Sequence, residues 1–219
     1  GGGGGAWWAL RWADEPRYAA TSKVRRHAPR PRMNTTPDSR RALLANREFT
    51  RFLAARFLAT LAVQMQTVAV GWQVYAATRN PLDLGLVGLS QFLPFVLLIL
   101  PAGHLADSRD RRRILGACFA LECACALLLL AFAAHGLESA RPVFAVMVLF
   151  GVARAFAMPT GQALLPNLVP RAQFGTAVAL NSSTWQVATI AGPSLGGLVY
   201  LAGPSVVYGS VAALLAASV

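Results

Sequence analysis

Two charged side chains interrupt stretches of sequence that are otherwise apolar. Arg154 lies in the middle of the apolar run 143–165, and Glu122 is the only carboxylate inside any such run. An arginine at the centre of a membrane helix costs at least roughly 2.5–3.5 kcal/mol, so it is expected to have a function or an ionic partner. If both runs are membrane helices, Glu122 and Arg154 lie about 12 Å and about 16 Å from the same face, at about 1.5 Å per residue. They could line a polar cavity and take part in ion coupling, or they could form a structural ion pair.

Polar residues also recur at helical spacing. The first apolar run and its N-terminal flank carry residues three or four positions apart, namely Arg56, Thr60, Gln64, Thr67 and Gly71. A later run carries Asn181, Trp185 and Gln186. Such spacing places side chains on one face of a helix. Either group could line an aqueous cavity or hydrogen-bond to a neighbouring helix, and both interpretations stay open.

The composition indicates that these residues belong to a membrane protein. Hydrophobic residues make up 55% of the 219 residues and charged residues 13%, whereas soluble domains carry about 25% charged residues. The net charge of +11 does not indicate nucleic-acid binding, because most basic residues lie in the first 32 positions and between apolar runs, not along a basic helix face. Cys118, Cys123 and Cys125 share one apolar run and fit neither a disulfide framework nor a zinc site.

Six apolar runs separated by short loops predict an all-α membrane protein. They span residues 57–78, 84–105, 114–134, 143–165, 174–201 and 205–219. The first five are long enough to cross a bilayer, which takes about 20 residues. The sixth is expected to be incomplete, which would make the chain a fragment. We expect residues 1–32 to be a disordered leader that need not belong to the natural protein, and residues 33–56 to be a cytosolic segment.

The arginines near the ends of these runs are divided unevenly between the two sides. Most lie in the N-terminal segment and in the loop between the second and third runs, which carries Arg109, Arg111, Arg112 and Arg113. The loops on the opposite side hold only Arg79 and Arg141. Because basic residues favour the cytoplasmic side of a membrane, the N-terminus is expected in the cytosol.

The loop after the second run carries the motif Gly103-His104-Leu105-Ala106-Asp107-Ser108-Arg109-Asp110-Arg111-Arg112-Arg113. It resembles the pattern Gly-x-Leu-Ala-Asp-Arg-x-Gly-Arg-Lys of the major facilitator superfamily. The matching residues are Gly103, Leu105, Ala106, Asp107, Arg111 and Arg112, whereas Ser108 and Asp110 depart from the pattern. Aspartate at 110 is familiar in the branch of enterobactin-exporter-like and macrolide-efflux-like proteins. The resemblance implies a cytosolic gating latch, in which Gly103 permits close helix approach and Asp107 meets a helix N-terminus or an arginine.

A second motif, Gly192-Pro193-Ser194-Leu195-Gly196-Gly197, resembles the Gly-Pro-x-x-Gly-Gly element of antiporter branches of the same superfamily. Ala188, Gly192 and Gly196 recur every four residues, which predicts a seam of small residues for tight helix contact. Pro193 should bend the helix because it removes a backbone hydrogen bond. The resemblance extends over residues 47–204, and members of the superfamily often carry an arginine linked to proton coupling in the fourth helix, where Arg154 stands.

The resemblance implies the N-terminal six-helix bundle of a major facilitator fold, truncated within its sixth helix. It implies secondary active efflux of a small amphipathic molecule, drug-like or siderophore-like, across the inner membrane by proton antiport. The implied partners are the lipid bilayer, the substrate, protons and a missing C-terminal six-helix half, with no cofactor, metal, nucleic acid or enzymatic activity. The alternatives are an uptake permease of the same fold and a non-transporting scaffold or remnant. The candidate coupling or cavity residues are Arg154, Glu122, Gln64, Thr67, Asn181 and Trp185.

Overall fold

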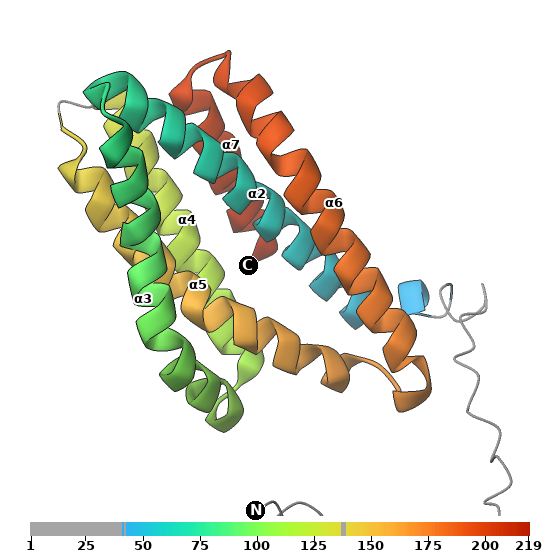
Figure 1. The fold of residues 1–219 in the computed structure, drawn as a ribbon. Coiled ribbons are helices and arrows are strands. Elements are labelled where there is room, and N and C mark those ends of the chain that lie inside the picture. The colour runs from blue at the N-terminus through green and yellow to red at the C-terminus, as the bar shows by residue number, and fades with distance from the viewer. Residues whose placement is uncertain (1–40, 42, 137–138) are drawn as a thin grey trace, which may run out of the picture. The chain divides into compact units, whose positions relative to one another are not determined.

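The computed structural model describes residues 41, 43–136 and 139–219, and the regular structure in this part of the chain is helical. Its long helices are α2 (Arg47–Thr78), α3 (Pro81–Ser108), α4 (Arg111–His135), α5 (Arg141–Leu168), α6 (Phe174–Tyr200) and α7 (Pro204–Ser218). A 3₁₀ turn, η1 (Arg171–Gln173), joins α5 to α6. Figure 1 shows the long helices running side by side. The predicted leader, residues 1–32, lies outside the described residues.

Among the described residues, four helices are long and apolar enough to cross a membrane, namely α2, α3 over Pro81–Leu105, α4 and α5. α6 has 27 residues, but the polar residues Asn181–Thr184 and Gln186 interrupt its apolar sequence, and it is not among the four. α7 has 15 residues, fewer than the roughly 20 that a crossing needs. The chain is therefore an all-α, multi-pass membrane protein, as the composition predicts, whereas a count of six spans is not confirmed by length and hydropathy.

Polar side chains at the helix starts decide where two of these helices begin. The side-chain oxygen of Asn46 accepts hydrogen bonds from the backbone N–H groups of Glu48 at 3.1 Å and Phe49 at 3.4 Å. Because this N-cap stabilises the first turn, α2 begins at Arg47, ahead of the apolar run that starts at Phe57. Asp110 caps α4 in the same way and accepts a hydrogen bond from the N–H of Arg112 at 3.0 Å.

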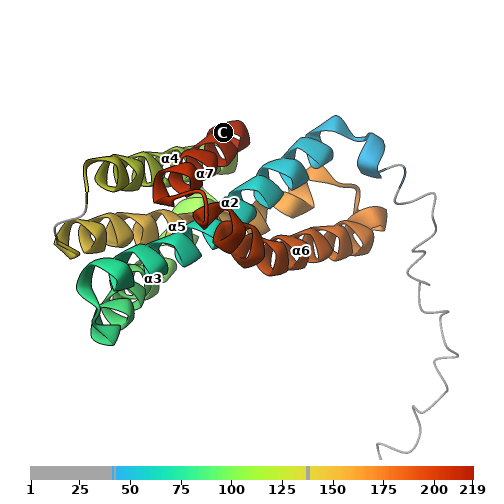
Figure 2. The same cartoon turned by 90° about the horizontal axis from the view of Figure 1, so that it is seen from above.

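The pairing of helices repeats along the chain. α2 packs against α6 and α7, α5 packs against α3 and α4, and α4 also contacts α7. If α2 is exchanged with α5, α3 with α6 and α4 with α7, the same set of helix pairs results. The described helices therefore fall into two sets of three, α2–α4 and α5–α7, that contact each other in the same order, a pattern typical of an internal repeat. Figure 2 shows α6 beside α2 and α3 beside α5.

Glycines allow the closest of these helix approaches. A Cβ atom at Gly151 of α5 would lie 2.8 Å from Cγ of Pro94 and 2.9 Å from the carbonyl carbon of Gln91, both in α3. A Cβ atom at Gly196 of α6 would lie 2.8 Å from Cα of Met65 in α2. Real Cβ atoms essentially never come so close to a neighbour, so both crossings depend on glycine.

Candidate substrate and coupling site

A cavity of about 200 Å³ lies between α2, α4, α5 and α6. Its polar and aromatic walls come from all four helices, and they comprise Arg56, Thr60, Gln64, Phe119, Glu122, Arg154, Trp185 and Thr189. Most of the side chains that are buried elsewhere in the described bundle are aliphatic or aromatic. The cavity therefore brings together charged and polar groups that are costly inside an apolar bundle.

Three of the lining side chains are charged, and they come from three different helices. The ion pairs formed between fully described side chains, Arg112–Glu48 and Arg113–Asp110, lie elsewhere. Glu122 Oε2 and Arg56 Nη1 are buried and have no hydrogen-bond partner. The ion pair that the similar depths of Glu122 and Arg154 allowed is thus not formed. Depth along a helix does not fix rotation about its axis, and the two side chains border a shared cavity instead of each other.

Arg154 also borders a second cavity of about 300 Å³, whose other walls are Gly88, Gln91, Phe92 and Phe95 of α3. The close approach of Gly151 to Gln91, about one turn before Arg154, brings α3 to this level. Oε1 of Gln91 is buried without a hydrogen-bond partner. Arg154 therefore borders polar space towards α3 as well as towards α2, α4 and α6.

The predicted polar stripes contribute to the cavity only in part. Gln64 and Trp185 line it. Thr67 is exposed, and its hydroxyl donates a hydrogen bond to the carbonyl of Val63 at 2.8 Å. Asn181 is half-buried and lies outside the cavity lining.

Arg56 lines the cavity but is absent from the six coupling or cavity candidates, although it belongs to the predicted polar stripe. The positive-inside rule accounted for it as one of the arginines flanking the first span. Its spacing of four residues from Thr60, and of four more to Gln64, was the signal that placed it on the cavity face.

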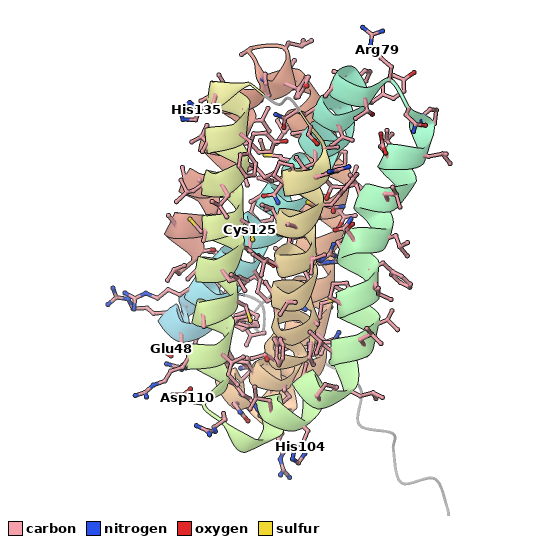
Figure 3. All side chains as sticks on the ribbon, turned by 90° about the vertical axis from the view of Figure 1, so that its left-hand side faces the viewer. Glu48, Arg79, His104, Asp110, Cys125 and His135 are labelled. Atoms are coloured by element: carbon pink, nitrogen blue, oxygen red, sulfur yellow. The ribbon has the colours of Figure 1, made fainter. Side chains whose placement is uncertain are left out.

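The predicted gating motif lies where α3 ends and α4 begins. Arg111 Nη1 donates a hydrogen bond to the carbonyl of Ala163 in α5 at 2.9 Å. Arg112 forms an ion pair with Glu48 near the start of α2. Together with the cap from Asp110, these contacts join the first turn of α4 to α2 and α5. Figure 3 shows Glu48 and Asp110 at the same end of the bundle.

The N-terminal half of that motif makes fewer contacts that can be described. The side chain of Asp107 lies outside the described residues. Leu105 is 39% exposed. No atom lies within 4 Å of a Cβ built at Gly103. The close helix approach expected at Gly103 is therefore not made within the described part of this chain, because no second helix reaches it there.

The glycines of the second motif face α2. A Cβ at Gly192 would meet Cβ of Gln64, and a Cβ at Gly196 would meet the backbone of Met65. Ala188, one turn earlier, is completely buried. Pro193 is exposed, and a Cβ at Gly197 would have no atom within 4 Å. These small residues thus allow α6 to pack closely on the turn of α2 that carries Gln64, which lines the cavity.

Comparison with known proteins identifies the family. The family of transmembrane secretion effectors, which is part of the major facilitator superfamily, matches residues 39–218. The chain belongs to this family. Its relatives are transporters and not enzymes, so the cavity of this secretion effector is a transport site candidate and not a catalytic one.

Two relatives show how much of a secretion effector this chain represents. The staphyloferrin A transporter of Staphylococcus aureus is 26% identical over 155 residues, which cover 68% of this chain and 38% of the relative. The putative multidrug resistance protein MdtD of Salmonella paratyphi B is 28% identical over 144 residues, which cover 65% of this chain and 29% of the relative. The matches therefore span less than half of each relative. No solved structure matches the chain significantly.

Proposed function

We propose that this secretion effector chain is one helix bundle of a secondary active exporter that moves a small amphipathic molecule across the inner membrane in exchange for protons. The supporting observation is the cavity that places Arg56, Glu122 and Arg154 among four helices of an apolar bundle. Ionisable residues inside a membrane protein commonly mark substrate or ion pathways. Transporters of this architecture place the substrate near the membrane midplane and expose it to each side in turn.

The relatives support an organic molecule as the transported compound. One is named for a siderophore, staphyloferrin A, and the other for multidrug resistance. Aromatic and apolar walls such as Phe119, Met158 and Trp185, next to charged groups, suit a molecule with both polar and apolar parts.

Within this function we assign the candidate residues to three tasks. Arg154 and Glu122 set the charge of the cavity and link its protonation to substrate binding, and Gln64 and Trp185 contact the substrate. The loop motif that includes Asp107 and Arg111 latches the cytosolic side, which also holds the N-terminus. The seam that includes Gly192 holds α6 against α2. Thr67 and Asn181, which lie outside the cavity, face the path that opens towards the second half.

The proposed partner is a second six-helix half. α3 exposes large apolar side chains along its length, including Leu89, Phe92, Leu97 and Leu100, and α6 does the same with Ile190 and Leu198. Lipid can cover such surfaces, and so can a second bundle. We propose that α3 and α6 form the edges on which the second half packs, so that transport requires the full-length protein, meaning this chain joined to that half.

The test is transport by the full-length protein in inverted and right-side-out membrane vesicles, with carboxyfluorescein and ethidium as anionic and cationic probes. Export predicts accumulation of a probe inside inverted, energised vesicles and its loss after a protonophore is added. R154Q should abolish accumulation and E122Q should change its dependence on pH, whereas L127A should do neither, because Leu127 is an exposed residue of α4.

The same assay separates the alternatives. An uptake permease would accumulate probe in right-side-out vesicles only. A scaffold or remnant would accumulate none in either orientation, and that result would refute the proposed function.

A further inference from the structure

The cavity between α2, α4, α5 and α6 carries an excess of positive charge. Arg56 and Arg154 contribute two guanidinium groups, and Glu122 contributes one carboxyl group. The cavity therefore has a net charge of about +1 when Glu122 is ionised and about +2 when it is protonated. An excess charge of this kind inside an apolar bundle is costly unless an opposite charge joins it.

The three charged groups do not neutralise one another in direct contact. Arg56 and Arg154 form none of the ion pairs found between fully described side chains. Arg56 Nη1 and Glu122 Oε2 are each buried without a hydrogen-bond partner. A buried donor of a charged group that lacks an acceptor is destabilising. Both atoms are inaccessible to solvent, so a ligand in the cavity would meet the accessible part of these side chains and add opposite charge beside them.

Arg56 is positioned from two sides. Its Cζ lies 5.8 Å from the centroid of the Phe52 ring, which is a cation–π distance. On the other side, a Cβ at Gly161 of α5 would meet Nη1 of Arg56 and lie 3.1 Å from its Cζ. Because glycine at position 161 has no side chain, there is space at this point for the guanidinium of Arg56. A guanidinium held in this way offers its N–H groups to a planar anion in a fixed orientation.

We propose that this cavity binds the anionic group of a small organic acid, with the guanidinium groups of Arg56 and Arg154 as its partners. This proposal rests on the proposed transport function and names its substrate class. A carboxylate matches the net charge and the geometry of a guanidinium. The volume of about 200 Å³ is below the roughly 300–1,000 Å³ of sites for drug-sized ligands. The cavity therefore takes the anionic group and its nearest apolar neighbours, and the rest of the molecule extends beyond it.

Binding of three isosteric probes to the full-length protein in lipid nanodiscs tests this proposal. The probes are 4-fluorobenzoate, 4-fluorobenzamide and 4-fluorobenzylammonium, followed by fluorine NMR at neutral pH. They share one fluorinated ring and differ in charge. The benzoate should bind most tightly, and R56Q and R154Q should each weaken it by roughly tenfold or more, the usual effect of losing a hydrogen bond between charged groups.

Two further variants separate the effect of the position of the Arg56 guanidinium from the effect of net charge. G161A keeps both arginines but displaces the guanidinium of Arg56, so it should weaken 4-fluorobenzoate binding without changing the net charge. R141Q removes the same charge from an exposed residue at the start of α5, outside the cavity and the loop motif, so it should leave binding unchanged. Size-exclusion profiles and melting temperatures establish that each variant is folded.

Three outcomes would overturn the proposal: equal or tighter binding of the amide or the ammonium probe, unchanged benzoate binding in folded R56Q and R154Q, or no binding of any probe to folded protein. The vesicle assay separates this failure from failure of the transport function. Accumulation of ethidium without accumulation of carboxyfluorescein would support the proposed export and contradict the proposed anion site. If 4-fluorobenzoate binding depends on both arginines but neither dye is transported, the result would support the anion site and contradict the proposed export.

Discussion

The contact between α6 and α2 yields a prediction whose size follows from the geometry. In Gly196→Ala, the new Cβ would lie 2.8 Å from Cα and 3.0 Å from the carbonyl oxygen of Met65. Both are backbone atoms, so no side-chain rotation relieves the clash. Because carbon atoms prefer about 3.5–4.0 Å, α6 must move away by roughly 1 Å. Overpacking of this kind costs about 1–3 kcal/mol. The higher helix propensity of alanine offsets roughly 0.5–1 kcal/mol of it.

Gly197→Ala is the matched control, because it gains the same helix propensity and its Cβ has no atom within 4 Å. The difference between the two variants therefore isolates the clash, at about 1–3 kcal/mol. The measurement is reversible unfolding of the full-length protein in mixed micelles with increasing sodium dodecyl sulfate. Gly197→Ala should match or exceed the stability of the unsubstituted protein, and Gly196→Ala should fall below it. Equal unfolding midpoints for the two variants would refute the close packing of α6 on α2.

The same unfolding assay tests three other contacts. Tyr208→Phe removes the hydroxyl that donates a 2.6 Å hydrogen bond to Gln73, which should cost about 1–3 kcal/mol of stability. Adding Gln73→Leu should restore most of this stability, because neither side chain then leaves a buried polar group without a partner. A further loss of stability in the double variant would contradict the role of this hydrogen bond. Arg111→Gln loses the bond to the carbonyl of Ala163 and should cost about 1.5–3 kcal/mol, so an unchanged midpoint would argue against that bond. Asn46→Ala loses the cap of α2 and the 3.3 Å hydrogen bond from Nδ2 to the carbonyl of Leu168, and loss of the cap alone should cost about 0.5–2 kcal/mol, whereas Asn46→Ser, which keeps the cap, should lose clearly less.

The sequence was sufficient to predict the helices and their order, because the bilayer imposes a length and an apolar composition that can be read from a single chain. The six apolar runs correspond in order to α2–α7. The same signal reports only the part of a helix that is apolar. It therefore placed the first span at Phe57, whereas the cap at Asn46 lets α2 begin at Arg47.

The arrangement of the site was less predictable, because it depends on which helix faces which. Spacing placed Arg56, Thr60 and Gln64 on one face of α2, and all three line the cavity. Spacing did not reveal that α4, α5 and α6 supply the other walls. Spacing did place Gly196, and not Gly197, in the seam with Ala188 and Gly192, and of these two glycines only Gly196 meets a neighbouring helix.

The charge of the cavity also determines how an anionic ligand and a proton on Glu122 influence each other. Arg56, Glu122 and Arg154 are the charged groups among its described lining residues. An ionised Glu122 repels a bound carboxylate, so protonation of Glu122 should tighten ligand binding. By linkage, ligand binding should then promote protonation to the same extent. Antiport requires the opposite relation, in which substrate and proton weaken each other.

If the ligand is an anion, the antiported proton is therefore exchanged outside this cavity. Glu122 is the only carboxylate within the predicted spans, so the exchanging group would belong to the second half. Alternatively, no proton is exchanged and the membrane potential alone drives export of the anion, since moving one charge through 100 mV is worth about 2.3 kcal/mol. Adding 4-fluorobenzoate to weakly buffered, purified protein with a pH-sensitive dye should cause proton uptake, and E122Q should abolish it. Proton release would show that the ligand and a proton on Glu122 weaken each other, which a carboxylate ligand beside Glu122 cannot explain.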